Sequence, residues 1–336
     1  MNTPGWFLKR NLAASLLLPL AGIYYIVSRL VYFSRLFHQK TSKRPVICIG
    51  NILAGGVGKT PIVQKIAGKL GAPVIMRGYG AAKPRQRAKS RERRAEIIGD
   101  EAAMLEKAGI KVYTGDRIEN INILNHKSKI INPKSPIVMD DGFQNPMIKK
   151  DLSILVFDES IGLGNGFLLP AGPLREPPAA IKRADAAIII KSKEQSDYAK
   201  ATSDKRAKSK NLEHIIRKYK KPVFYAMNET LLPSSLFLIP YIAFAGIGYP
   251  QKFFDALNPR PIQTKSFPDH YPYTPADLKK LLEKAGEMRA ELVTTEKDWV
   301  RMPPWAQAKI KVAKLETTIE PAFWTWLKRK LNENEG

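Results

Sequence analysis

Residues 46–70 read VICIGNILAGGVGKTPIVQKIAGKL, and this stretch decides the fold of the chain. The apolar start, residues 46–49, lies between Pro45 and Gly50 and predicts a short buried strand. A glycine-rich segment follows, and the periodic residues after it predict a helix. Such a loop exposes backbone N–H groups that can surround phosphate oxygens, and the following helix points its positive dipole end at them. The stretch therefore predicts a strand, a phosphate-binding loop (P-loop) and a helix, the opening of an α/β domain.

The residues predicted to bind a nucleotide are Gly55, Gly56, Val57, Gly58, Lys59, Thr60 and Pro61. In this motif the Lys59 ammonium reaches the β- and γ-phosphates of ATP, and the Thr60 hydroxyl binds Mg²⁺. The loop has Leu53 where the usual spacing has a glycine. Its double glycine resembles the variant loop of partitioning-type ATPases, but Ala54 stands where that class carries a lysine. A membrane-associated ATPase of that class is the alternative function.

The charge of the chain is strongly positive. Its 336 residues include 55 Lys and Arg against 31 Asp and Glu, a net charge of +24. Such a surface favours anionic partners: phosphorylated substrates, anionic lipids or nucleic acid. The sequence contains no recognisable nucleic-acid-binding module, so we expect no nucleic-acid partner. The single Cys48 excludes an intrachain disulfide.

The N-terminus predicts contact with a membrane. Residues 12–27 are almost wholly apolar, and basic residues lie on both sides of them. This run is shorter than the roughly 20 residues that cross a bilayer as a helix. The aromatic and basic residues that follow suit the headgroup region. We therefore expect a peripheral or monotopic helix at a cytoplasmic membrane face, with a single-pass helix as the alternative. The basic stretch 81–94 predicts a solvated loop or a further anion-binding segment.

Acidic residues follow the P-loop helix at two places. Residues 136–139 predict a buried strand that ends in Asp140 and Asp141, the position where P-loop enzymes keep the acid that holds Mg²⁺. Neighbouring carboxylates repel each other unless a cation separates them. A second pair, Asp100 and Glu101, opens a predicted helix, where capping alone accounts for acidic residues. The glycine- and proline-rich loop 162–178 contains Arg175.

The second half of the chain repeats the α/β pattern. Strands are predicted at 223–226, 241–245 and 292–295, and a helix is predicted to start at Pro275 behind the cap Thr274. The charged stretch 193–221 separates the two halves. The sequence thus predicts a P-loop NTPase-like α/β/α domain, a second smaller α/β domain and an N-terminal membrane-associated helix. The expected boundaries are 1–37 for the N-terminal segment, 38–220 for the P-loop domain and 221–336 for the smaller domain.

Taken together, the motifs resemble those of the tetraacyldisaccharide 4′-kinase family of lipid A (lipopolysaccharide) biosynthesis. The matching stretches are GNILAGGVGKTP, RGYG, GDE, MDDGFQ, GNGFLLPAGPLREP, FAGIG, FPDHYPYT and TTEKD, in the family's order. Ala102 stands where the family usually has proline, and Asn145 stands where a histidine commonly follows DDGFQ. Both departures concern local loop geometry, because neither position carries a predicted chemical role.

The resemblance implies a function and a location. The family's enzymes transfer the γ-phosphoryl group of ATP to the 4′-hydroxyl of tetraacyldisaccharide 1-phosphate, giving lipid IVA. The implied cofactors are ATP and Mg²⁺, and the implied partners are this acylated disaccharide phosphate lipid and the inner-membrane surface. The location is then the cytoplasmic face of the bacterial inner membrane.

The resemblance also implies roles for individual residues. Asp100 would be the base that accepts the hydroxyl proton, paired with His270 of the DH motif, and closure of the smaller domain would bring substrates and residues together. Arg175 would join Lys59 in neutralising γ-phosphate charge. Asp141, rather than Asp140, and Glu101 would complete the Mg²⁺ site with Thr60.

Overall fold

The chain folds as two compact units in the computed structural model, which describes residues 7, 10–77, 99–126, 135–192 and 202–333. We call Thr3–Arg77, Ala108–Asn228 and Thr317–Gly336 the P-loop unit. Met1–Asn2, Gly78–Lys107 and Glu229–Glu316 form the other, which we call the His270 unit. The sequence predicts one boundary near residue 220, whereas the units interleave along the chain. Asp100 consequently belongs to the same unit as His270.

The P-loop unit contains a seven-stranded parallel array in the order β3-β2-β4-β1-β5-β6-β7. Its strands are β1 (Val46–Gly50), β2 (Val74–Met76), β3 (Val112–Thr114), β4 (Ile137–Asp140), β5 (Leu152–Asp158), β6 (Ala186–Ser192) and most of β7 (Val223–Leu231). Parallel strands bring their carboxyl ends to one edge. Because β1 and β4 are hydrogen-bonded neighbours, the loops after Gly50 and Asp140 start side by side.

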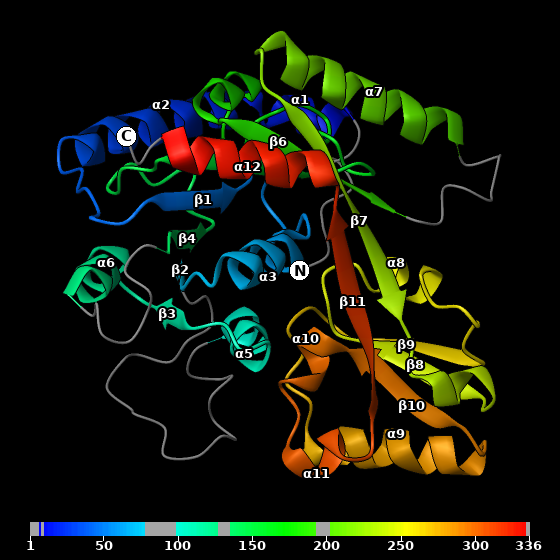
Figure 1. The fold of residues 1–336 in the computed structure, drawn as a ribbon. Coiled ribbons are helices and arrows are strands. Elements are labelled where there is room, and N and C mark those ends of the chain that lie inside the picture. The colour runs from blue at the N-terminus through cyan, green and yellow to red at the C-terminus, as the bar shows by residue number, and fades with distance from the viewer. Residues whose placement is uncertain (1–6, 8–9, 78–98, 127–134, 193–201, 334–336) are drawn as a thin grey trace. The chain divides into compact units, whose positions relative to one another are not determined.

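Helices cover this array and close its core. They are α3 (Lys59–Leu70), α6 (Arg117–His126), α7 (Thr202–Lys218) and α12 (Pro321–Glu333), with the 3₁₀ helix η3 (Pro178–Arg183) before β6. Figure 1 shows α3 beside β1 and β4, which it contacts. The buried residues of α3 are Ile62, Val63, Ile66 and Ala67. A fully buried aliphatic side chain of this size contributes about 1.5–3 kcal/mol, so this face fixes the helix, and with it the P-loop, on the sheet.

The His270 unit is a smaller α/β/α layer around the parallel order β11-β10-β8-β9. Its strands are β8 (Tyr241–Ala245), β9 (Gln263–Ser266), β10 (Glu291–Thr295) and most of β11 (Lys311–Ile319). Ile242 and Phe244 face one apolar cluster, and the alternate residues Tyr241, Ala243 and Ala245 face another. Both faces of β8 are therefore buried, as expected of a parallel sheet.

The His270 unit contains several helices, and all of them except α5 (Asp100–Lys107) contribute side chains to those two apolar clusters. The others are α8 (Pro250–Asp255), α9 (Pro275–Glu287), α10 (Glu296–Trp299) and α11 (Pro304–Gln307), with the 3₁₀ helix η5 (Ser234–Phe237). The predicted start of α9 is confirmed, since Thr274 accepts a hydrogen bond from the Asp277 N–H and Pro275 lies in the first turn. Two strands were missed by the sequence analysis, β9 and β11.

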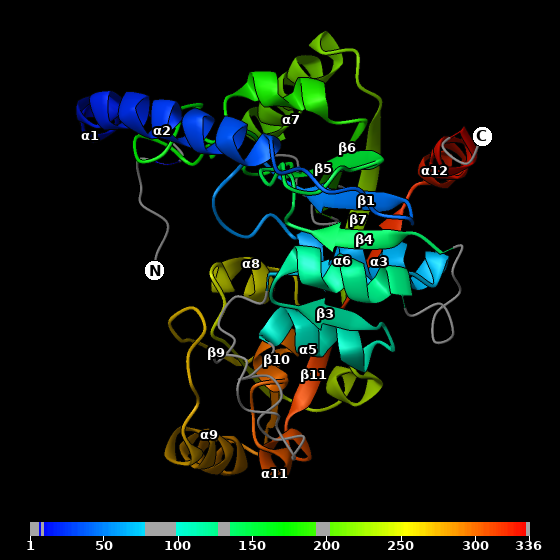
Figure 2. The same ribbon diagram turned by 90° about the vertical axis from the view of Figure 1, so that its left-hand side faces the viewer.

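The N-terminal apolar stretch forms two consecutive helices, α1 (Leu12–Leu16) and α2 (Leu18–Leu36). Pro19 is the second residue of α2, a position that suits proline because its missing N–H breaks no helical hydrogen bond in the first turn. Figure 2 shows the two helices as a rod beside the loop that follows β5. Within the described part of the chain, no helix combines the length and hydropathy needed to cross a membrane. The predicted basic loop 81–94 lies outside the described residues.

Candidate active site

The P-loop begins directly after β1 and ends at the first residue of α3. Gly55 and Gly58 have φ angles of 102° and 75°, which a residue with a side chain rarely adopts, so the glycines permit this path. Among the described residues, no atom lies within 4 Å of the position that a Cβ of Gly55 or Gly56 would occupy. The loop backbone is therefore open to a ligand. Pro61 lies in the first turn of α3 and, because it lacks an N–H, donates no hydrogen bond to a phosphate.

Asp141 and two cations form the charged centre of the P-loop unit. The Lys59 Nζ lies 3.3 Å from Asp141 Oδ1. The Arg175 Nη1 lies 3.0 Å from Asp141 Oδ2 and 3.2 Å from Oδ1. Three residues predicted separately from the sequence thus meet at one point. Burial raises the pKa of Asp141, but the charges of Lys59 and Arg175 outweigh it and hold that pKa below its ordinary value.

The turn that presents Asp141 is strained and braced. Asp141 has a φ of 49°, an uncommon conformation that aspartate tolerates better than most residues and that recurs at functional sites. Its N–H donates to the Ile49 carbonyl at 2.9 Å. The Arg117 Nη2 donates to the carbonyls of Asp140 at 2.8 Å and Asp141 at 3.1 Å. These bonds fix the turn against β1, so the carboxylate position depends on backbone contacts rather than on the cations alone.

The loop that carries Arg175 is tied to two other segments. The Arg175 N–H donates to the Ile52 carbonyl at 2.8 Å, and the Ala54 N–H donates to the Pro173 carbonyl at 2.7 Å, so this loop pairs with the start of the P-loop. On its other side, the Tyr24 hydroxyl of α2 donates to the Arg175 carbonyl at 3.1 Å. The N-terminal helix therefore contacts the backbone of the arginine that faces Asp141.

The predicted base pair is in contact within the His270 unit. The His270 Nδ1 lies 3.0 Å from Asp100 Oδ2, and the Lys297 Nζ lies 3.3 Å from His270 Nε2. A lysine ammonium has no acceptor, so Nε2 must accept. The ring proton is then on Nδ1, which donates to Asp100. The side chain of Asp100 is 11% exposed and that of His270 is 58% exposed.

A buried polar network around Asp298 contacts Asp100 through Arg301. Asp298 Oδ1 accepts from the Gly246 N–H at 3.0 Å and from the Tyr273 hydroxyl at 3.0 Å. Its Oδ2 accepts from the Thr295 hydroxyl at 2.6 Å. Arg301 binds Asp298 with Nη2, at 2.5 Å, and approaches Asp100 with Nε, at 3.4 Å. Burial raises the pKa of Asp298 above its ordinary value, against the lowering effect of Arg301.

Comparison with known proteins decides the family. The family model for tetraacyldisaccharide-1-P 4′-kinase matches residues 13–332. A tetraacyldisaccharide 4′-kinase of Paramagnetospirillum magneticum is 36% identical over 95% of this chain and 94% of its own length. A second, from Phenylobacterium zucineum, is 35% identical over 93% of each chain. The chain belongs to the tetraacyldisaccharide 4′-kinase family.

A solved structure agrees with this assignment. The crystal structure of LpxK from Aquifex aeolicus in complex with ATP is 25% identical, covers 95% of this chain and 98% of its own, and has a TM-score of 0.70. The resemblance read from the motifs is thereby confirmed, as is the P-loop NTPase-like α/β fold. The chain has the activity of its family, a tetraacyldisaccharide 4′-kinase of lipid A biosynthesis, and this excludes the partitioning-type ATPase as its function.

The P-loop unit has oxygen donors that fit Mg²⁺. The described residues contain no cluster of three or more His, Cys, Asp or Glu that could hold a metal ion. Magnesium needs no such cluster, since in phosphoryl-transfer enzymes it takes one or two carboxylates and completes its shell with water and substrate phosphates. The Thr60 hydroxyl and the Asp141 carboxylate are hard ligands of this kind. The lowered pKa of Asp141 keeps that carboxylate ionised.

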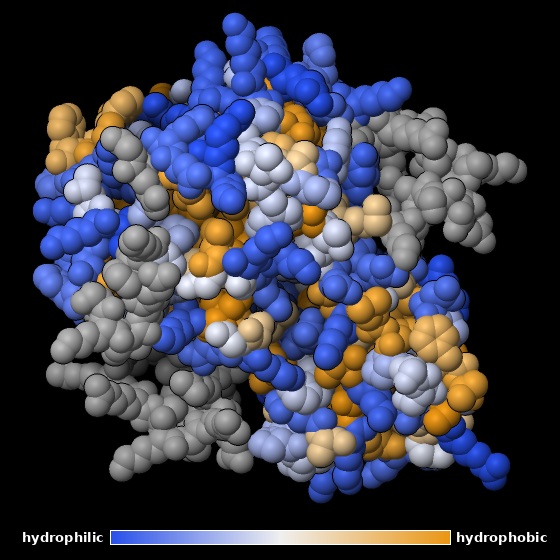
Figure 3. Space-filling model, viewed as in Figure 1, coloured by the Kyte–Doolittle hydropathy of each residue, from blue (hydrophilic) through white to orange (hydrophobic). Residues whose placement is uncertain are grey.

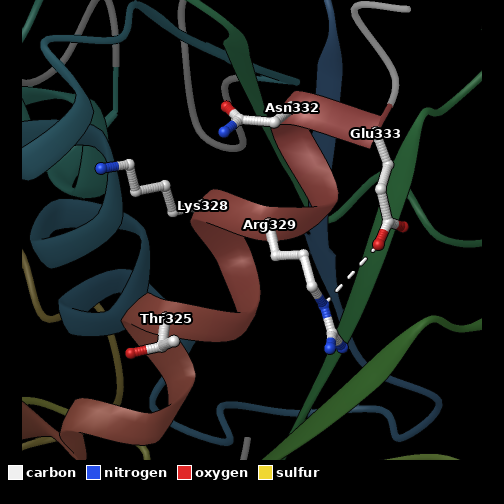
Figure 4. Close-up of a pocket in the computed structure, with 5 residues that line it drawn as sticks. All are labelled: Thr325, Lys328, Arg329, Asn332 and Glu333. Carbon is white, nitrogen blue, oxygen red and sulfur yellow. Dashed lines mark ion pairs between the residues drawn. The ribbon is translucent and has the colours of Figure 1, made fainter.

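A surface hollow on α12 does not belong to this kinase site. It measures about 590 Å³ and is lined by Thr325, Lys328, Arg329, Asn332 and Glu333. Figure 4 shows these side chains spread along one helix, with an ion pair of 3.6 Å between Arg329 and Glu333. None of them is among the predicted site residues, and exposed polar side chains on a single helix give a ligand no enclosed surface.

Several contacts of this kinase site were not predicted from the sequence. Asp298 and Lys297 lie in the TTEKD motif, which the sequence analysis recognised without assigning it a role. Arg301 follows that motif by one helical turn, and this spacing was the available signal. Tyr24 gave no signal, because an aromatic residue in an amphipathic helix suits a membrane interface equally well.

Proposed function

We propose that the P-loop unit binds ATP and Mg²⁺ and prepares the γ-phosphoryl group for transfer. Lys59 and the glycine N–H groups bind the phosphates, Thr60 and Asp141 hold Mg²⁺, and Arg175 neutralises charge on the γ-phosphoryl group. The bound ion would neutralise phosphate charge as the bond to the leaving group breaks. The meeting of Lys59, Arg175 and Asp141 supports these roles, together with the ATP complex of the Aquifex aeolicus relative.

Asp100 and His270 are proposed to handle the proton of the acceptor, the 4′-hydroxyl of tetraacyldisaccharide 1-phosphate. Among the described residues, the contacts of His270 and Arg301 both fall on Asp100 Oδ2, which leaves Oδ1 to accept that proton. The Nδ1–H of His270 keeps the carboxylate oriented. The product would be lipid IVA. Glu101 stays a predicted Mg²⁺ ligand, and domain closure on both substrates stays a prediction.

The observation that carries this proposal is the 3.0 Å contact between His270 and Asp100. The test is phosphate transfer from ATP to purified tetraacyldisaccharide 1-phosphate. Asp100→Asn and His270→Ala should each lower kcat by about 10²–10⁴-fold, the usual contribution of proton transfer, with little change in ATP affinity. Because the pair acts as a unit, the double variant should be little worse than the poorer single one.

Controls for this test use residues of the same type. His214→Ala, an exposed histidine of α7, should leave kcat unchanged. Losses that multiply in the double variant would show that Asp100 and His270 act independently, and the dyad would then be abandoned. Near-normal turnover in Asp100→Asn would remove the base from the mechanism.

The N-terminal helices are proposed to hold the enzyme at the cytoplasmic face of the inner membrane, where its acylated substrate lies. Six exposed apolar side chains support this proposal: Leu12, Leu16, Leu20, Ile23, Ile26 and Leu30. In Figure 3, hydrophobic side chains reach the surface at the upper left, where Figure 1 draws α2. An apolar surface that must stay exposed in water is unfavourable, whereas a bilayer buries it.

Vesicle flotation tests this membrane contact. The protein should float with vesicles of anionic phospholipid, and a triple variant with serine at Leu20, Ile23 and Leu30 should not. Exposed leucines and isoleucines contribute little to folding, so the variant should keep its melting temperature. Full binding by the triple variant would mean that these side chains do not make the contact.

A further inference from the structure

The guanidinium of Arg301 contacts two carboxylates, that of the partly exposed Asp100 and that of the fully buried Asp298. Its Nε lies 3.4 Å from Oδ2 of Asp100, which belongs to α5. Its Nη2 binds Asp298, which is fully buried in α10. The guanidinium is rigid and planar, so the position of Nη2 fixes the position of Nε. The buried Asp298 therefore determines where the positive charge beside Asp100 lies.

Gly246 connects the same residues through its backbone. Its N–H donates to Asp298 Oδ1 at 3.0 Å. Its carbonyl accepts from Arg301 Nη2 at 3.1 Å and from the His270 N–H at 3.0 Å. A Cβ at this position would lie 2.9 Å from the Tyr273 hydroxyl and 3.1 Å from Asp298 Oδ1. The Gly246 carbonyl thus binds both partners of Asp100, and a side chain at this position would displace the Tyr273 hydroxyl.

We propose that Arg301, held by Asp298, is a positioning residue that keeps the Asp100 carboxylate oriented towards the acceptor hydroxyl. This inference rests on the proposed role of Asp100 as the base. Arg301 approaches the same oxygen, Oδ2, that His270 binds, so two donors fix one oxygen and direct the other to the substrate. Neither Arg301 nor Asp298 acts on the substrate itself.

The test compares Arg301→Ala and Arg301→Lys with the unchanged enzyme in the phosphate-transfer assay. Loss of a residue that orients a catalytic group typically costs about 10–100-fold in activity, and we expect a fall of that size in kcat. The affinity for ATP should not change, because the phosphates are bound in the other unit. Guanidinium chloride at millimolar concentration should restore part of the kcat of Arg301→Ala. Lysine ends in a single ammonium group instead of a planar guanidinium, so the kcat of Arg301→Lys should also fall.

A double variant separates positioning from a general structural role. If Arg301 acts through Asp100, Arg301→Ala should cause little further loss when Asp100 is already Asn. A structural defect would instead lower kcat by the same factor in both backgrounds, and that result would overturn the inference. Arg260→Ala, which removes an exposed arginine of the same unit, is the matched control. Its kcat should equal that of the unchanged enzyme, and added guanidinium should not alter it.

The kcat of Asp100→Asn tests the proposed base separately from the positioning role of Arg301. If Asp100→Asn keeps its kcat, the proposed base is wrong and the inference falls with it. If Asp100→Asn is inactive but Arg301→Ala and Arg301→Lys retain full kcat, the base stands and the positioning role of Arg301 is refuted. Should Arg301→Ala fail to fold, Arg301→Lys and Asp298→Asn decide by the same assay, with melting temperatures measured alongside.

Discussion

Asp141 and Asp298 are both aspartates paired with an arginine, yet their surroundings shift their pKa values in opposite directions. The Asp141 side chain is 16% exposed and contacts two cations, Lys59 and Arg175. The Asp298 side chain is fully buried and contacts one cation, Arg301, besides neutral donors. Burial raises both pKa values, but the two cations outweigh it at Asp141, whose pKa is lowered, whereas burial outweighs Arg301 at Asp298, whose pKa is raised.

This difference matches the proposed roles of the two carboxylates, with Asp141 binding a ligand and Asp298 positioning its neighbours. Asp141 has partners that are themselves part-exposed, so a phosphate or a metal ion can take the place of one of them. Asp298 is bound by backbone, hydroxyl and guanidinium donors that no ligand replaces. A carboxylate with neutral donors and full burial orients its neighbours, whereas one held by accessible cations can exchange partners.

The largest expected effect comes from removing the cations of Asp141. Arg175→Ala and Lys59→Ala should each lower kcat by about 10³-fold or more, the usual contribution of a charge that stabilises phosphoryl transfer. Both side chains are partly exposed, so the fold should persist by circular dichroism. Lys65→Ala, on the exposed face of the same helix α3, is the matched control. Turnover near normal in either variant would remove that cation from the site.

The comparison predicts unequal losses of stability when each carboxylate is truncated. Asp298→Ala should lower the free energy of unfolding of the His270 unit by about 3–5 kcal/mol, because Arg301 loses the shorter of its two carboxylate contacts inside a buried site. Asp141→Ala should cost less, since solvent can reach Lys59 and Arg175 once they are released. Urea unfolding followed by circular dichroism measures both. Equal losses would contradict the distinction between the two carboxylates.

A smaller effect is expected from the hydrogen bond between α2 and the Arg175 loop. Tyr24→Phe removes the hydroxyl that donates to the Arg175 carbonyl. A single neutral hydrogen bond contributes about 0.5–1.5 kcal/mol, so kcat should fall several-fold at most. Tyr25→Phe, one position further along the same helix, should leave it unchanged. The assay is phosphate transfer with vesicle-bound substrate, and equal rates for the two variants would mean that the contact does not hold Arg175.

The smallest effect is a pH dependence of stability that Asp141 contributes. Its pKa is lowered by folding, so the unfolded chain binds a proton more readily and stability rises with pH. The contribution is complete above the ordinary pKa of aspartate, about 3.9, and is lost as the pH falls through the folded value. Melting temperatures of the unchanged protein and Asp141→Asn should therefore converge on acidification from pH 5. A difference in melting temperature that stays constant with pH would show that Asp141 does not contribute this pH dependence.

The strands that the sequence predicted are those with continuous apolar runs. Residues 46–49 and 241–245 are buried throughout, and such runs give a strong signal in a parallel sheet. The missed strand β11 reads KVAKLETTI and is largely exposed along its length, so its polar residues mask the pattern. Its pairing with β10 depends on tertiary context, which propensity does not contain.

The sequence predicted the residues of the candidate site that have a chemical role of their own. It did not predict the residues that only hold those side chains in position. Lys59, Asp141 and Arg175 lie in three motifs far apart in sequence, and the order β4-β1 together with the Arg175 loop accounts for their meeting. The contact of Asp100 with His270 was implied by the family resemblance. Gly246 was missed because its role consists of backbone hydrogen bonds, which have no sequence period, and Arg301 because only its helical spacing from Asp298 indicated it.

The interleaving of the two units has a consequence for how the protein is made. A ribosome releases the P-loop, Asp141 and Arg175 early, but the last helix of that unit, α12, is released after the whole His270 unit. Phe323 and Trp326 of α12 pack against Phe224, with ring centroids 5.4 Å apart in each case. Domains made from contiguous segments can fold during synthesis, N-terminal part first. Here the core of the P-loop unit closes only after α12 has been synthesised, so neither unit can be produced intact as one continuous fragment.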